Sequence, residues 1–424
     1  MSYRCISIFL LALFAPAWVR AHATDTHAAP GSLSLDEARR RAQAYSPTLA
    51  ATRIGIDVAA ARVNQAGSRP VPELGIEVEN FGGTLNGFKR AESTFMLSQR
   101  FERGGKRGAR LDAARAVRSL AESEVALDEL DLARDVAVAF AEGLAAQERL
   151  RVEEEVLGLS ADILRSVEEK VQLGAALRAE ATRARVAQSL VQADVDAARE
   201  EMETSRRSMA RLWGSSVPEF ERFVGLLDSL RAVPGGGEID SLINSNPRLE
   251  VADATIRLRD SEVRLEKSAG KRDLSVGAGY RLLDGTEDGA FVAGLSIGLP
   301  FGDRNQGNIE AVAASLRAAE AERQVVTEAL RRALDQTTGR IAGAQAAVRR
   351  LREDAIPAAN DSYREVENAY RQGRLSYIDL LEARRALTDA RLREIGWLTQ
   401  LFTLRAELEW IAGRPLPALW EASR

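Results

Sequence analysis

The sequence predicts a mainly α-helical protein with a small β part, built as a tandem repeat of strand hairpins and very long helical hairpins. Three observations lead to this fold class. Short motifs recur about 200 positions later in the chain, long segments rich in alanine, leucine, arginine and glutamate follow them, and each copy holds two short runs that alternate between apolar and polar residues. Repetition on this scale with strong helix formers indicates an elongated helical architecture.

The composition favours helices packed side by side and argues against a nucleic-acid partner. The chain has 424 residues, of which 28% are charged, yet its formal net charge is only −4. A protein that binds nucleic acid is expected to carry a basic face or stripe. Aromatic residues make up only 5% of the chain, which suits closely packed long helices better than a large globular core.

The first 23 residues have the pattern of a secretory signal peptide. Arg4 precedes an apolar run at 6–14, and the segment ends in Ala21-His22-Ala23. The alternative, a membrane anchor, would need a longer uninterrupted apolar run. Cleavage after residue 23 would remove Cys5, the only cysteine. The exported chain would then have no disulfide and no cysteine to carry a lipid.

The remainder of the chain contains a tandem sequence repeat. Ser46-Pro47-Thr48-Leu49 recurs as Asn246-Pro247-Arg248-Leu249, and Leu212-Trp213-Gly214 recurs as Ile411-Ala412-Gly413. Two independent globular domains could also produce such a repeat, but the long helices in each copy favour one elongated structure. The resulting segments are a first copy at 24–232, a linker Val-Pro-Gly-Gly-Gly at 233–237 and a second copy at 238–424.

Each copy contains two predicted strands with one apolar and one polar face. The run Glu-Leu-Gly-Ile-Glu-Val-Glu at 73–79 places three aliphatic side chains on one face and three glutamates on the other. The predicted strands are 72–81, 93–101, 273–282 and 290–299. Runs of this length suit tilted strands of an outer-membrane barrel, whereas the alternative is two surface hairpins on a soluble protein. Four strands are too few to close a barrel, so several chains would have to pool them, and three chains would supply twelve.

A long helical hairpin follows each strand pair. The segment from 105 to 172 has no proline, and its alanines at 133, 137, 141 and 145 would let a neighbouring helix approach closely. Gly174 and Gly373 stand where each long helix must reverse. Gly158 and Pro357 are equivalent and suggest a local bend in each copy. The predicted helices are roughly 35–69, 105–172 and 176–213 in the first copy and 238–270, 304–371 and 376–413 in the second.

The stretch Ser-Gln-Arg-Phe-Glu-Arg-Gly-Gly-Lys-Arg at 98–107 joins a strand to the first long helix. A phosphate-binding loop would need glycine at position 100 and Ser or Thr at position 107, where the chain has arginines. The equivalent stretch at 301–307 keeps a turn but lacks both the Gly-Gly and the Lys-Arg pair, as expected of a structural bend. The expected hinge consists of Gly104, Gly105, Lys106 and Arg107.

These features together resemble the outer-membrane efflux ducts of the TolC type, over nearly the whole mature chain. The resemblance is carried by Glu-Asn-Phe-Gly-Gly at 79–83, by the stretch at 98–107 and by Gln-Gly-Arg-Leu-Ser at 372–376. The first two are similar to the cobalt–zinc–cadmium resistance branch. The resemblance implies a homotrimer, with a twelve-stranded barrel in the lipid of the outer membrane and a helical α-barrel crossing the periplasm. It also implies two partners, a periplasmic adaptor and an inner-membrane pump of the resistance–nodulation–division class.

The resemblance also implies which residues narrow or polarise the duct. Acids near the hairpin turns would form a constriction ring repeated threefold: Glu180, Asp379 and Glu382. The alternative is that these are ordinary solvated carboxylates. Arg178 and Arg374, beside the turn glycines Gly174 and Gly373, are candidates for adaptor contact. Glu73, Glu77 and Glu79 would line the barrel lumen and attract cations weakly, although a charged strand face turned to water explains them equally well.

The sequence gives little support to an enzyme or to a resident metal or cofactor. After cleavage His27 would be the remaining histidine, in the leader of the mature chain, and zinc or copper sites favour imidazole and thiolate ligands. A periplasmic coiled-coil adaptor is a third class, but the tandem layout argues against it. The predicted function is therefore a duct for heavy-metal cations, with export of organic compounds or proteins as the alternative.

Overall fold

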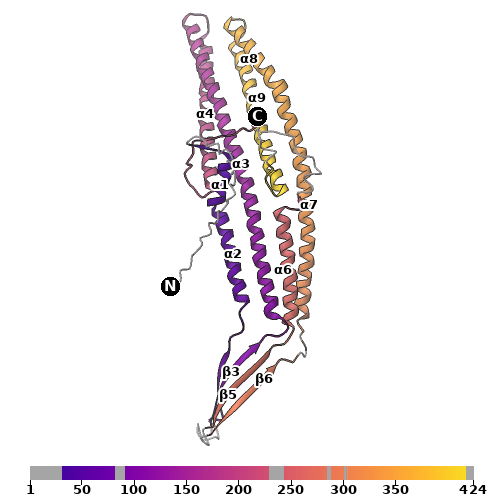
Figure 1. The fold of residues 1–424 in the computed structure, drawn as a ribbon. Helices are drawn as coiled ribbons and strands as arrows, with labels where there is room; N and C mark the ends of the chain where they lie inside the picture. Colours follow the sequence, from indigo (N-terminus) through magenta and orange to yellow (C-terminus); the bar gives the residue numbers. More distant parts are fainter. Residues whose placement is uncertain are drawn as a thin grey trace, which may run out of the picture.

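The computed structural model describes residues 31–81, 91–228, 243–283, 288–299, 302 and 304–416. The expected signal peptide, His27 and the 233–237 linker lie outside these residues. Long helices run side by side along one axis, the strands form one end of the molecule, and two helical hairpin tips form the other (Figure 1). The protein is therefore an elongated rod whose two ends differ in structure.

Both copies contain a helix, two strands and a long helical hairpin in that order, and they differ in the elements around this shared series. The first copy comprises β1 (Ser32–Leu33), α1 (Leu35–Tyr45), α2 (Pro47–Ala66), β2 (Glu73–Glu79), β3 (Glu92–Phe101), α3 (Lys106–Gln172), α4 (Arg178–Arg211) and β4 (Arg222–Phe223). The second comprises α6 (Pro247–Ala269), β5 (Leu274–Leu283), β6 (Asp288–Ile297), α7 (Gln306–Arg350), the π-helix η1 (Leu351–Ala355), α8 (Ile356–Arg371) and α9 (Tyr377–Ala412). No helix within the described residues is both long and apolar enough to cross a membrane.

The opening helical stretch of the first copy is two helices, where one was expected over 35–69. Ser46 separates α1 from α2 with an extended backbone, at φ −61° and ψ 123°. A residue that precedes proline is pushed out of the α region by the proline ring, and Pro47 follows Ser46 directly. Asn246 has the same extended geometry before Pro247, with ψ 131°. Both Pro motifs of the repeat therefore mark the start of a helix.

The recurring Pro and Gly motifs build a joint at which one helix stacks on the end of another. The Asn246 side chain accepts a hydrogen bond from the Arg248 backbone N–H at 2.8 Å, which caps the start of α6. Its Nδ2 donates to the carbonyls of Trp410 and Ile411 at the end of α9, at 2.9 and 2.8 Å. One side chain thus satisfies both helix ends. Gly413 ends α9 at φ +71°, where a Cβ would lie only 2.7 Å from the Cα of Asn246.

Gly158 and Pro357 affect their helices differently, although they are equivalent in the repeat. The first long helix, α3, continues without a break through Gly158 to Gln172. In the second copy the hydrogen bonding changes to a π-helix at Leu351–Ala355, which ends two residues before Pro357. Glycine keeps its backbone N–H, whereas proline lacks one and clashes with the preceding turn. The local irregularity expected in both copies is therefore found in the second.

The core surrounds the middle of α3. Ala137, Ala141 and Ala145 are buried on α3, where their small side chains admit neighbouring helices. Phe223 of β4 packs edge-on against Phe140, with ring centroids 5.6 Å apart. The short strand that carries Phe223 is held in a parallel pair with β1. The described segment that follows α4 and carries β4 is thereby held against α3.

The strands form one antiparallel sheet in the order β2-β3-β5-β6. Its register aligns Ile76, Phe95, Tyr280 and Phe291 in one row across all four strands. The apolar side chains on this face are exposed, reaching 92% for Phe291. The opposite face carries glycine, serine and most of the sheet's charged residues, in agreement with the alternation expected from the sequence. Nothing in the chain's own described structure covers the apolar face.

Candidate functional site

Both hairpin tips reverse the chain by the same backbone motif. Gly174 and Gly373 have φ +73° and +72°, in the left-handed region that favours glycine. In the first tip the N–H of Ala175 donates to the carbonyl of Lys170 at 2.8 Å, and in the second Arg374 donates to Ala369 at 2.9 Å. These are Schellman bonds, which satisfy carbonyls left free at a helix end. Arg178 and Arg374 lie exposed beside these turns.

The two equivalent acids after these turns have different surroundings. Asp379 belongs to a capping box at the start of α9: its Oδ2 accepts from the Ser376 hydroxyl at 2.7 Å and from the Ser376 backbone N–H at 2.9 Å. These hydrogen bonds stabilise the carboxylate and hold the pKa of Asp379 below its usual value. Leu177 replaces Ser376 in the first copy and makes no side-chain cap. Glu180 is therefore not engaged in the same way.

Glu180 instead lies close to the tyrosine of the neighbouring hairpin. Burial raises the pKa of Tyr370, and the negative charge of Glu180 raises it further. Glu382, one turn beyond Asp379 on α9, is exposed. The structure thus places all three expected constriction acids in the first turns after the hairpin tips. One of them caps a helix, one faces the seam between the hairpins and one is open to solvent.

A tyrosine cluster joins the two hairpins near their tips. Tyr363, Tyr370 and Tyr377 are buried against residues of α3 and α4. The ammonium group of Lys170 on α3 lies 4.2 Å from the ring centroid of Tyr370, a cation–π contact between the copies. The sequence analysis did not identify this cluster. The seven-residue spacing of the tyrosines, in a chain with six of them, is the signal that could have revealed it.

Two further charged groups lie in this seam. Arg384 of α9 is buried and donates a hydrogen bond to the Ser160 hydroxyl of α3. Burial lowers the pKa of Arg384. Burial also raises the pKa of Glu153, and the Asp194 carboxylate raises it further. Neither residue stood out in the sequence, because charged residues at helical spacing are usually solvated.

We expect Ser376→Ala to loosen the start of α9. Loss of an N-cap typically costs about 1 kcal/mol, so the amides of the first turn should exchange hydrogen roughly fivefold faster. Because the Ser376 hydrogen bonds lower the pKa of Asp379 in the folded protein, the stabilisation from the Asp379 carboxylate is present at neutral pH and is lost as the pH falls through the lowered value. Hydrogen-exchange mass spectrometry of the purified protein measures the exchange rates of these amides. Leu177→Ala is the matched control, and an equal effect at α4 would contradict the capping account.

The stretch between β3 and α3 is a turn whose basic residues also form an ion pair and a hydrogen bond with other parts of the chain. Gly104 and Gly105 have φ +76° and +77°, and the turn leads directly into α3. The Lys106 ammonium group forms a 2.8 Å ion pair with Asp273, just before β5 in the other copy. Arg107 donates to the carbonyl of Gly67 at the end of α2, at 2.6 Å. The two basic residues thus connect the start of α3 to both copies.

Arg110 strengthens the same connection and was not singled out from the sequence. Its guanidinium donates to the carbonyls of Ala66 and Ser68, at 2.9 and 3.0 Å, and forms a 2.6 Å ion pair with Glu102. The hydrogen bond from Arg110 lowers the pKa of Glu102. Arginine close to helix-terminal carbonyls is favourable because these carry partial negative charge. The basic motif therefore binds protein carbonyls and carboxylates.

The three strand acids lie on the polar face of the sheet. Glu79 forms a 3.1 Å ion pair with Arg281 of β5. Glu73 lies 3.6 Å from Arg100 of β3, and both of these side chains are more than half exposed. Glu77 lies between them along β2 and is exposed. The acids therefore share a face, as the alternation predicts, and two of them have arginine partners.

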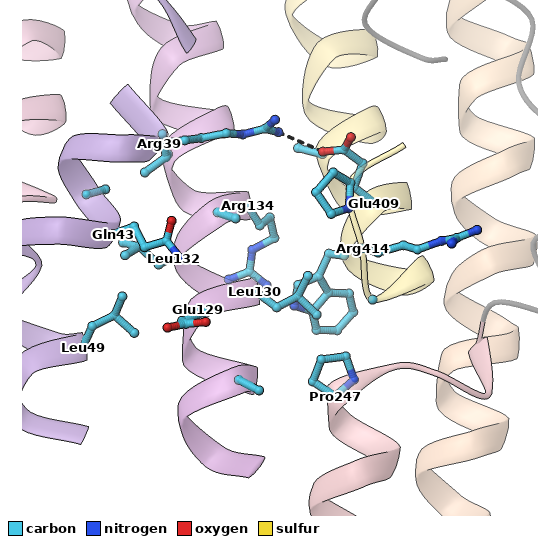
Figure 2. A pocket seen from close by; sticks show the side chains of 18 residues that line it. Arg39, Gln43, Leu49, Glu129, Leu130, Leu132, Arg134, Pro247, Glu409 and Arg414 are labelled. Carbon is cyan, nitrogen blue, oxygen red and sulfur yellow. Dashed lines mark hydrogen bonds and ion pairs between the residues drawn. The ribbon is translucent and has the colours of Figure 1, made fainter. Parts of the chain in front are cut away.

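The cavity drawn in Figure 2 lies where α1, α3, α6 and α9 meet and has a volume of about 340 Å³. The ion pair between Arg39 and Glu409 crosses its upper side at 2.8 Å. Trp410 lines it and donates its indole N–H to Asp131. Its lining is mostly apolar, and Arg39, Glu129, Arg134 and Glu409 form ion pairs within the protein, so the cavity is a gap in the packing between helices. Among the described residues, no group of three or more His, Cys, Asp or Glu side chains could hold a metal ion.

Comparison with known proteins gives consistent matches over most of the chain. The family model described as outer membrane efflux protein matches residues 38–215 and 239–414. The cobalt-zinc-cadmium resistance protein CzcC of Cupriavidus metallidurans is 28% identical over 386 residues, covering 91% of each chain. The nickel-cobalt-cadmium resistance protein NccC of Alcaligenes xylosoxydans is 26% identical and covers 76% of this chain and 71% of its own.

Solved structures share the fold at lower sequence identity. CusC, described as forming a transmembrane channel, has a TM-score of 0.75 at 16% identity, covering 90% of this chain and 92% of its own. The outer membrane protein VceC of Vibrio cholerae has a TM-score of 0.74 at 18% identity, covering 90% and 96%. Each match covers 90% of this chain, so the fold is shared over most of its length.

Proposed function

Because this chain belongs to the outer membrane efflux protein family, we propose that it is the outer-membrane duct of a tripartite efflux system that exports heavy-metal cations. Its place in the outer membrane and its channel architecture follow from the family. The substrate, the oligomer and the partner proteins are the proposed part. The proposal of a metal substrate rests on the match to a cobalt-zinc-cadmium resistance protein over 91% of both chains.

The sheet supports a homotrimer. Its outer strands, β2 and β6, each have one edge that pairs with no other strand of the described chain. Unpaired backbone groups are costly in lipid, so the edges must be joined. Three chains would join them into a closed barrel of twelve strands. The exposed apolar face would then contact lipid, and the polar face with Glu73, Glu77 and Glu79 would surround the lumen.

The helical tips support contact with partner proteins at the opposite end. The first tip carries a shallow groove between α3 and α4 that Glu168, Gln172, Arg178 and Arg185 line. Arg374 is exposed on the second tip. Charged, exposed tips at the end remote from the strands suit docking to a periplasmic adaptor, which would connect the duct to an inner-membrane pump of the resistance–nodulation–division class.

The acids at the tips would polarise the entrance. In a trimer Glu180, Asp379 and Glu382 would each occur three times around one opening. Carboxylates brought together in a narrow mouth repel one another and attract cations. Cations would therefore concentrate at the entrance, whereas anionic compounds would be repelled. This is the electrostatic behaviour that a metal-export duct requires.

Deletion of the gene tests the proposal in a bacterium that expresses the cognate pump and adaptor. We expect lower tolerance of zinc, cobalt or cadmium, restored by the wild-type gene on a plasmid, and unchanged tolerance of organic antimicrobials. Metal content of the cells should rise in parallel. Unchanged metal tolerance in the deletion strain would refute the metal substrate. A loss confined to organic compounds would favour the alternative duct function.

A further inference from the structure

Arg281 lies at the centre of a charge cluster on the polar face of the sheet. From β5 its guanidinium reaches Glu92 of β3 at 2.7 Å and Glu79 of β2 at 3.1 Å. It also donates to the Thr94 hydroxyl at 2.9 Å. One side chain therefore bonds to the adjacent strand β3 and to β2 beyond it, and Thr94 is almost fully buried beneath it.

The register explains why the sheet needs a cation here. Glu79 and Glu92 are directly opposite each other on β2 and β3. Like charges at directly opposed positions destabilise a sheet. The row that contains them continues through Leu283 to Asp288 of β6. Three of the four residues in this row are therefore acids, and the row lies at the end of the sheet farthest from the helices (Figure 1).

The next row on the same face, two residues closer to the helices, contains the countercharge. It aligns Glu77, Thr94, Arg281 and Ala290 across the four strands. Beyond it comes a row of uncharged residues, Gly75, Met96, Gly279 and Val292. In the two polar-face rows nearest the outer end, four acids thus accompany a single base. A second base, Arg100, lies near the helices, where its contact with Glu73 is longer, at 3.6 Å.

We propose that Arg281 sets the ion selectivity of the outer mouth of the duct. The inference rests on the proposed function, because it needs the polar face to surround a lumen. In a trimer, three copies of Arg281 would offset part of a ring of acids and also hold Glu79 and Glu92 in place. Within these described strand rows the acids still outnumber the bases, so this ring keeps a net negative charge and attracts cations. Loss of the arginine would leave that ring uncompensated and more cation-selective.

Single-channel recording in planar lipid bilayers under a KCl gradient tests this inference. For Arg281→Gln we expect the ratio of potassium to chloride permeability to rise by roughly twofold or more, since each chain loses one positive charge from the face that would line the outer opening. Arg281→Lys keeps the charge and should stay near the wild-type value. Arg100→Gln removes an equal charge from the same face near the helices and should produce a smaller change.

Glu92→Gln provides an independent measurement and should lower the same ratio. If Arg281→Gln forms pores with wild-type selectivity, the inference is wrong. If that variant yields no pores, an unchanged ratio in Glu92→Gln overturns it instead. Wild-type protein that forms no pores at all would refute the proposed duct, which separates failure of the function from failure of the inference.

Discussion

Gly143→Val is expected to unfold the middle of the molecule at a markedly lower temperature than wild type. Gly143 is buried in α3, and a Cβ built on it would overlap the ring of Phe223. That ring cannot move aside easily, because it packs edge-on against both Phe140 and Phe220. Overpacking of a close-packed core costs typically 1–3 kcal/mol, and valine adds three carbon atoms where one does not fit. We therefore expect a cost of about 3 kcal/mol.

Circular dichroism at 222 nm of the detergent-solubilised protein gives the apparent midpoint of thermal unfolding. Gly158→Ala is the matched control, since a Cβ at Gly158 in the same helix meets no atom within 4 Å. Alanine is a better helix former than glycine by about 1 kcal/mol, so the control should unfold at a slightly higher temperature. The packing account fails if Gly143→Val is as stable as wild type.

These two glycines show how far sequence reasoning reaches in this protein. Both interrupt a run of helix formers, and both leave α3 intact. The difference between them is the contact with Phe223, 80 positions farther along the chain, which no local pattern contains. By contrast, the left-handed turns at Gly174 and Gly373 and the alternation of the strands depend on neighbouring residues. Those features could be predicted from the sequence.

In the candidate site, too, features set by neighbouring residues were predictable, whereas contacts between distant residues were not. The sequence placed a turn at Gly104 and Gly105, but the partner of Lys106 is Asp273 in the other copy. Arg281 is likewise bonded to acids about 190–200 positions away, so its role depends on how the strands pair. The capping box at Ser376 is different, because Ser-x-x-Asp before a helix is a recognisable pattern. The break at Ser46 was predictable too, from the proline that follows it.

The orientation of the sheet gives the second large prediction. Leu97 lies on the apolar face of β3 and is 58% exposed in the single chain. If that face contacts lipid, Leu97→Arg places a charge in the bilayer, at a cost of about 2–4 kcal/mol for each chain near the midplane. With three chains affected at once, we expect heat-sensitive trimer in the outer-membrane fraction to fall to roughly a tenth of wild type or less.

Ser98→Arg is the decisive control, because the adjacent residue points to the opposite face. Its row contains Glu73, Gly277 and Gly294, so the new arginine would lie in the lumen opposite a carboxylate, with room beside the glycines. Trimer should assemble in near wild-type amounts, and Leu97→Ala should behave similarly because it removes size without adding charge. A pair of surface hairpins on a soluble protein predicts a different result: both arginine variants would accumulate equally, and neither would depend on the membrane. Equal amounts of the Leu97→Arg and Ser98→Arg proteins would therefore refute a lipid-facing apolar surface.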